Sequence, residues 1–165
     1  MRHMMASAAL LTGLFAANTA LAAQPPKPGT AFEDWIVECE KAGDKQKCFI
    51  SQTLNVKDSK GRLVKASIGY LGQNDEPTVV VLLPLGIWLP AGAAFKVGDM
   101  PQASMIIQQC TPQGCVATAP LKPEHIKALG TGKTLSFGMQ PAGSKETLVV
   151  GVSIKGLAAG LSALK

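Results

Sequence analysis

Hydrophobic and polar residues alternate along most of the chain with the two-residue period of β-strands. Residues 32–40 (FEDWIVECE) put Trp35, Val37 and Cys39 on one face and mostly acidic side chains on the other. Successive side chains of a strand point to opposite faces, so this pattern predicts a half-buried strand. Further strands are predicted at residues 48–56, 63–70, 105–110, 115–119, 133–139 and 147–154.

The longest apolar stretch outside the N-terminus is residues 78–97, TVVVLLPLGIWLPAGAAFKV. Prolines and glycines interrupt it, so it is not the unbroken run of about 20 apolar residues that a membrane helix needs. Residues 79–83 instead predict a strand buried on both faces, and a second strand is predicted to begin near Ala93. The stretch contains no acid, base, nucleophile or metal ligand, so it carries information about the fold rather than about chemistry.

Two short segments near the C-terminus have helical signals. Pro123 stands at a first-turn position and Gly130 ends a segment of about two turns. Residues 156–164 predict a brief closing helix. Eight or nine strands with turns roughly every ten residues predict an all-β fold, an antiparallel, immunoglobulin-like β-sandwich with one or two short helices.

The first 22 residues are typical of a secretory signal peptide. Arg2 is followed by an apolar run, and Ala20-Leu21-Ala22 supplies the small residues of a cleavage site. Residues 23–31 read as an extended, proline-rich leader. Residues 32–165 are then predicted to form one β-sandwich domain, large enough to bury its own core.

The charge of the chain is moderately basic. Lys and Arg number 16 against 11 Asp and Glu, a net charge of +5. Loss of Arg2 with the signal leaves 15 against 11, or +4, and Arg62 as the remaining arginine. The lysines are scattered and aromatic residues are few, so the sequence does not favour a nucleic-acid partner.

Four cysteines, Cys39, Cys48, Cys110 and Cys115, occur in a chain predicted to be exported. An even number in an oxidising compartment argues for two disulfides, with three possible connectivities. Each close pair lies at the ends of a predicted hairpin, which favours Cys39–Cys48 and Cys110–Cys115. The alternative is a four-cysteine zinc site, but eight residues between Cys39 and Cys48 do not fit a zinc knuckle.

Candidate catalytic groups are sparse. His125 is the only histidine left after signal removal, and we expect its side chain to face solvent from the short helix. Glu38 and Glu40 share one strand face, a spacing that could pair two carboxylates as glycosidases require. Charged residues are also ordinary on the outer face of a hairpin. No phosphate loop, dinucleotide fingerprint or metal motif is present, so the sequence predicts no cofactor and argues against an enzyme.

Five segments in order resemble one known family. They are WIVEC at residues 35–39, CFISQ at 48–52, LPLGI at 83–87 with Leu89 and Gly92, Cys110 with Gly114-Cys115, and VSIKGL at 152–157. Together with the export signal, this series is similar to the invasion-associated locus B family, although Leu157 stands where that family usually has an aromatic residue.

The resemblance implies a small exported β-sandwich protein of Gram-negative bacteria with no established catalytic activity. The shared positions read as residues that make the fold, namely the four cysteines, Trp35, Gln52, Pro84, Gly86 and Gly114. Gln52 is a polar residue on the apolar face of its strand and needs hydrogen-bond partners there, so we expect a structural amide rather than a ligand contact.

The sequence therefore predicts a non-enzymatic binding protein of the cell envelope, periplasmic or on the outer surface, with a role in host-cell invasion or adhesion. The partner would be another protein, an envelope component or the host-cell surface. One alternative is a periplasmic envelope-maintenance protein unrelated to hosts. The other is a periplasmic hydrolase that uses Glu38, Glu40 or His125.

Overall fold

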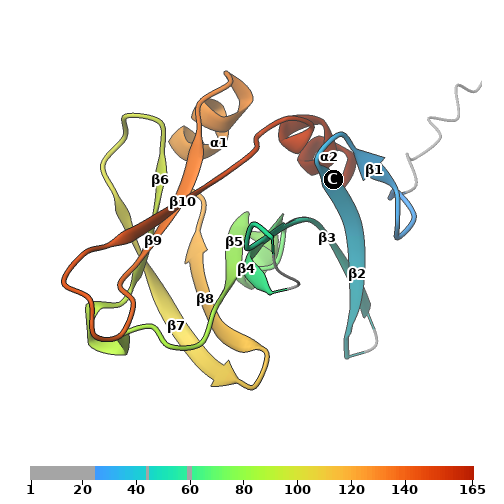
Figure 1. Cartoon of the computed structure of the whole chain (residues 1–165). Helices are drawn as coiled ribbons and strands as arrows, with labels where there is room; N and C mark the ends of the chain where they lie inside the picture. Colours follow the sequence, from blue (N-terminus) through green and yellow to red (C-terminus); the bar gives the residue numbers. More distant parts are fainter. Residues whose placement is uncertain (1–24, 44, 59–60) are drawn as a thin grey trace, which may run out of the picture.

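A computed structural model describes residues 25–43, 45–58 and 61–165 and contains ten strands and two short α-helices (Figure 1). The N-terminal strands are β1 (Ala31–Phe32), β2 (Trp35–Ala42), β3 (Lys45–Asn55), β4 (Arg62–Gly69) and β5 (Thr78–Leu83). The later strands are β6 (Ala93–Val97), β7 (Ala103–Thr111), β8 (Gly114–Pro120), β9 (Leu135–Met139) and β10 (Leu148–Val152). The helices are α1 (Pro123–Gly130) and α2 (Leu157–Ala163), with 3₁₀ turns η1 (Gln73–Asp75) and η2 (Leu89–Ala91).

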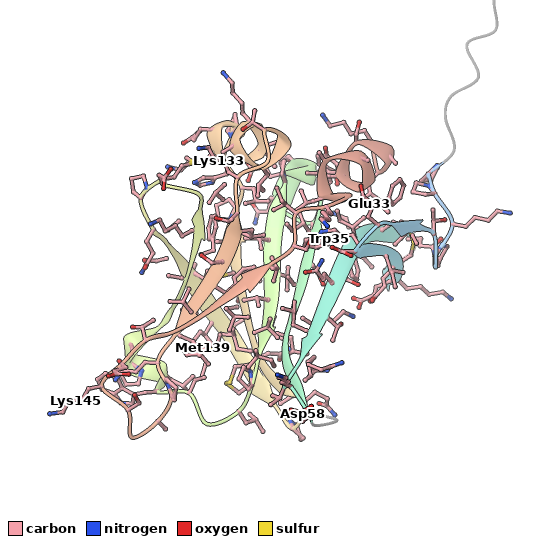
Figure 2. The ribbon with its side chains drawn as sticks, turned by 45° about the horizontal axis from the view of Figure 1, so that its top comes forward. Glu33, Trp35, Asp58, Lys133, Met139 and Lys145 are labelled. Carbon is pink, nitrogen blue, oxygen red and sulfur yellow. A yellow bond between two sulfur atoms is a disulfide. The ribbon has the colours of Figure 1, made fainter. Side chains whose placement is uncertain are left out.

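The strands form one antiparallel sheet in the order β1-β2-β3-β4-β5-β8-β7-β6-β9-β10. The sheet curls so strongly that β6, β9 and β10 lie opposite β2 and β3, with β4 and β5 between the two halves (Figure 1). Side chains from both halves, Trp35 and Met139 among them, fill the interior (Figure 2). The predicted antiparallel all-β fold with short helices is thus confirmed, and its sandwich is built from a single curled sheet.

One strand boundary differs from the prediction. Residues 32–40 were expected to form one strand, but the chain turns between β1 and β2, where Glu33 has a φ of +52°. The alternation of Trp35 and Val37 holds within β2, and both side chains are fully buried. The turn between β1 and β2 could not be predicted, because the hydrophobic pattern of a sequence does not reveal a single residue with left-handed backbone geometry.

A second difference concerns β5, which was predicted to be buried on both faces. Val79, Val81 and Leu83 are buried in the core. Val80 and Leu82 point to the opposite face and are only half-buried. The apolar run is therefore fully covered on one side of the sheet alone.

The segment after β10 returns to the start of the domain. α2 packs against β1, β2 and β3, whereas α1 packs against β6 and α2 (Figure 1). Part of the proline-rich leader is held as well, because the Val37 amide donates to the Thr30 carbonyl at 2.8 Å and the Gly29 amide donates to the Val37 carbonyl at 2.8 Å. The predicted signal peptide, residues 1–22, lies outside the described residues.

Candidate interaction surface

Residues 84–90, here called the apolar loop, follow β5, include the start of η2 and carry large hydrophobic side chains to the surface. Leu85 is 56% exposed, and Trp88 and Leu89 are each 50% exposed. Three large apolar side chains exposed within five residues are a concentration that is typical of a contact site.

The backbone of the apolar loop is fixed rather than free. The Trp88 amide donates to the Gln140 carbonyl at 2.7 Å, and the Ala142 amide donates to the Gly86 carbonyl at 2.7 Å. Gly86 has a φ of +84°, a left-handed conformation that explains why glycine is used there. Ile87 packs against the core and anchors the loop from below. The exposed side chains are therefore presented on a rigid support.

The support is the turn between β9 and β10, which lies beside η2 in Figure 1. Ile87 and Pro141 form an isolated bridge across this contact. The Gln140 side-chain amide donates to the Ser144 carbonyl at 2.5 Å and holds the turn itself. Lys145 projects from the same turn (Figure 2). Two segments more than 50 positions apart in sequence thus build one surface.

All four cysteines are paired. Cys39 is bonded to Cys48 across β2 and β3, and Cys110 is bonded to Cys115 across β7 and β8. These are the pairings that the hairpins favoured, and they use every sulfur that the zinc alternative would have needed. No cluster of His, Cys, Asp or Glu with the makings of a metal site occurs in the described part of the chain.

Gln52 is held entirely by backbone groups. Its Nε2 donates to the Asp34 carbonyl at 3.1 Å and the Ser153 carbonyl at 3.4 Å, and its Oε1 accepts from the Ser153 amide at 2.9 Å. Trp35 Nε1 also donates to the Ser153 carbonyl, at 2.9 Å. These bonds satisfy the polar atoms of Gln52 and connect β2 and β3 to the chain beyond β10.

Both glycines singled out in the sequence, Gly86 and Gly114, have positive φ angles. Gly114 has a φ of +137°, and a Cβ there would lie 2.3 Å from the Leu83 carbonyl oxygen. Gly86 meets no such crowding and is required by its conformation alone. Pro84 is half-buried where β5 ends. Pro84 and Gly86 thus shape the apolar loop itself, and Gly114 permits the close approach of β8 to the end of β5.

The two candidate carboxylates, Glu38 and Glu40, have different surroundings. Glu38 Oε2 accepts from Lys65 Nζ at 2.6 Å, and Glu38 Oε1 accepts from Ser51 Oγ at 2.5 Å. Burial raises the pKa of Glu38, but the hydrogen bonds and charge of Lys65 and the Ser51 hydroxyl outweigh it, so the pKa lies below the ordinary value. Glu40 is exposed on the same strand, opposite Lys47. An ionised, hydrogen-bonded Glu38 is a poor general acid.

The expectation that His125 faces solvent is wrong. The side chain is only 6% exposed and its ring meets Phe95 edge-on, with 5.1 Å between ring centroids. Its Nδ1 accepts from the Lys122 amide at 3.1 Å, which caps the first turn of α1. A ring that both packs on β6 and caps its own helix has a structural role. Of the three residues of the hydrolase alternative, Glu38 and Glu40 share one face of β2, whereas His125 is on α1, which packs on β6 and α2.

Comparison with known proteins identifies the family. A family model described as invasion associated locus B (IalB) protein matches residues 35–165. The chain belongs to the IalB family. Invasion protein B homologs of Brucella abortus strains 2308 and 9-941 are each 24% identical to it over 134 residues, which cover 81% of this chain and 77% of theirs.

The fold is shared with a solved structure. The crystal structure of invasion associated protein B from Bartonella henselae has a TM-score of 0.69 and 21% sequence identity, and the match covers 86% of this chain and 94% of that one. The family resemblance seen in the sequence is thereby confirmed. The curled sheet is the architecture of an IalB-family protein rather than a peculiarity of this chain.

The exposed part of the apolar loop was missed in the sequence. Residues 78–97 were interpreted as fold-making because they are apolar, and Leu85, Trp88 and Leu89 were not singled out as surface residues. The available signal was the prolines and glycines that interrupt this stretch, Pro84 and Gly86 before Trp88 and Pro90 and Gly92 after Leu89. A connecting segment interrupted in this way is expected to run over the protein surface.

Proposed function

We propose that this IalB-family chain is an exported, non-enzymatic interaction protein of the cell envelope that binds its partner through the apolar loop. The observation that carries the proposal is the exposure of Leu85, Trp88 and Leu89 on a backbone-fixed loop. Large apolar side chains on a rigid support lose little conformational entropy on binding, and tryptophan is frequent among residues that dominate interfaces.

Export is supported by several features together. The sequence begins with a stretch typical of a secretory signal, and the two disulfides suit an oxidising compartment. No helix among the described residues is long and apolar enough to cross a membrane. The absence of catalysis is supported by the engagement of Glu38 with Lys65 and by the structural use of His125.

Location is tested by protease digestion of intact and permeabilised cells. Digestion on intact cells would place the protein at the outer surface, and host-cell membranes would then be the fraction to test. Protection until permeabilisation would place it in the periplasm, and envelope fractions would be tested instead. Recovery of the protein only in the cytoplasm would contradict export.

Binding is tested with purified protein and the fraction that its location selects. We expect saturable binding, and we expect its affinity to fall at least tenfold when Trp88 and Leu89 are both replaced by alanine. The matched control is Ile106→Ala, since Ile106 is 68% exposed on β7 and lies outside the loop. Absence of saturable binding would contradict the proposal. If Ile106→Ala weakened binding as much as the double loop variant, the assignment of the binding site to the apolar loop would be contradicted.

A further inference from the structure

The outer face of the sheet contains a second apolar region, separate from both the core and the apolar loop. Val80 and Leu82 of β5 point away from the core, and so do Phe49 of β3 and Val116 of β8. Their sequence neighbours Ile50, Val79, Val81 and Ala117 are the residues that face the core. Apolar side chains thus line up across both faces of the same strands.

These four side chains form the floor of a hollow of about 430 Å³, here called the outer hollow. Its volume falls within the range of roughly 300–1,000 Å³ typical of small-molecule sites. Phe49 is only 6% exposed, although the strand register puts its side chain on the outer face of the sheet. Opposite Phe49 stands Gly69, where a Cβ would come within 2.7 Å of the Phe49 Cβ. A glycine therefore permits the close strand approach beneath the hollow.

Charged side chains of both signs border the outer hollow, and lysines are the more numerous among its lining residues. Lys41, Lys47 and Lys65 line it together with one acidic residue, Glu40. The ammonium groups of Lys47 and Lys65 pair with carboxylates outside the lining, Asp75 at 3.2 Å and Glu38 at 2.6 Å. An ammonium has three donors, so each of these amines retains the capacity to bind a further anionic group.

We propose that the outer hollow binds a long-chain fatty acid, with the alkyl chain on the floor and the carboxylate beside Lys47 and Lys65. A peptide is disfavoured as the ligand, because the floor strands β3, β5 and β8 are each paired on both sides and offer no edge for strand addition. The occupant must therefore be held by apolar contact and by rim charge. A single-chain lipid with an anionic head satisfies both demands, and this binding site is independent of the apolar loop.

The proposal is tested by calorimetric titration of the purified protein with dodecanoate. We expect saturable binding of one molecule per chain. Dodecanol, which has the same chain and no charge, should bind at least tenfold more weakly, and dodecyltrimethylammonium should not bind. In heteronuclear NMR spectra, dodecanoate should shift the resonances of Val80, Leu82 and Val116 and leave those of Trp88 unchanged. This readout needs no substitution and is unaffected by how a variant folds.

Two variants locate the site. Val80→Trp should fill the hollow and weaken dodecanoate binding at least tenfold, whereas the matched control Val149→Trp, at a 63% exposed position on β10, should leave it unchanged. Lys65→Met should weaken the binding of dodecanoate and not that of dodecanol. Failure of dodecanoate to bind, equal binding of the cationic amphiphile, or shifts confined to the apolar loop would overturn the proposal. So would a dimer that Val80→Trp dissociates, because the hollow would then be a contact between copies of this chain.

Discussion

Trp35 Nε1 and the carbonyl oxygen of Ser153 are 2.9 Å apart and 118 positions apart in the sequence. The bond joins the first long strand to the segment that follows the last one. β10 is the final strand of the sheet and does not pair with β1, so side chains rather than a strand ladder connect the two ends. Gln52 adds two further bonds to the backbone of Ser153, one to its carbonyl oxygen and one from its amide. This cluster closes the curled sheet.

Replacing Gln52 with leucine should therefore destabilise the whole domain. The substitution preserves the approximate volume but leaves the Ser153 amide without its acceptor, which costs about 1–3 kcal/mol of unfolding free energy. The measurement is equilibrium urea denaturation followed by far-ultraviolet circular dichroism.

The matched control is Gln108→Leu. Gln108 donates an exposed hydrogen bond to Thr118 within a hairpin, and water can replace that bond. Its loss should change the unfolding free energy by less than about 0.5 kcal/mol. Equal effects of the two substitutions would show that Gln52 does not close the sheet.

The sequence predicted the strands well because their signal is local. Alternation at Trp35 and Val37 and the turns between hydrophobic runs depend only on neighbouring residues, and the hairpins then brought each cysteine pair together. The need of Gln52 for hydrogen-bond partners was also visible, since a polar side chain on an apolar face must be satisfied. Its partner Ser153 was not, because a contact across 101 positions leaves no local pattern.

The candidate surfaces were harder to predict for the same reason. Leu85 and Trp88 look like core residues in the sequence, and their exposure results from the packing of residues 84–90 on the β9–β10 turn. His125 was expected to face solvent because that is the commoner position for a histidine on a helix. Its burial depends on the position of Phe95 in β6, which sequence spacing does not give.

Gly156 should tolerate no side chain. Its φ is +80°, and a Cβ would lie 1.9 Å from the Phe32 carbonyl oxygen, where α2 begins beside β1. A left-handed alanine costs about 1–2 kcal/mol before any steric clash is counted. We expect Gly156→Ala to lower the unfolding free energy by more than about 2 kcal/mol, measured by urea denaturation.

Gly151→Ala provides the comparison. A Cβ at Gly151 would meet no heavy atom within 4 Å, and its backbone is not left-handed. Because alanine also loses less backbone entropy than glycine on folding, this substitution should be neutral or slightly stabilising. If the Gly156 variant were as stable as the Gly151 variant, the backbone at the start of α2 would be able to move to accommodate a side chain without loss of unfolding free energy.

Reducing the disulfides should weaken the domain without unfolding it. Cys39–Cys48 and Cys110–Cys115 span only 9 and 5 positions, so each constrains a short loop of the unfolded chain and contributes about 2–3 kcal/mol. The reduced protein should keep its β-sheet spectrum and unfold at a lower urea concentration. A variant with all four cysteines replaced by serine should be insensitive to reductant. Unfolding on reduction alone would mean that the bridges supply most of the stability.

His125 should make stability depend on pH. Burial lowers its pKa below 6.5, with the nearby Glu124 raising the pKa and Lys122 lowering it. Below about pH 6.5 the unfolded chain therefore binds a proton that the folded chain resists, so the unfolding free energy falls as the pH falls. His125→Gln should reduce this slope between about pH 7 and pH 5.5. The slope of unfolding free energy against pH is measured by urea denaturation at several pH values. Identical slopes for the original chain and the His125→Gln variant would show that protonation of His125 does not destabilise the folded state.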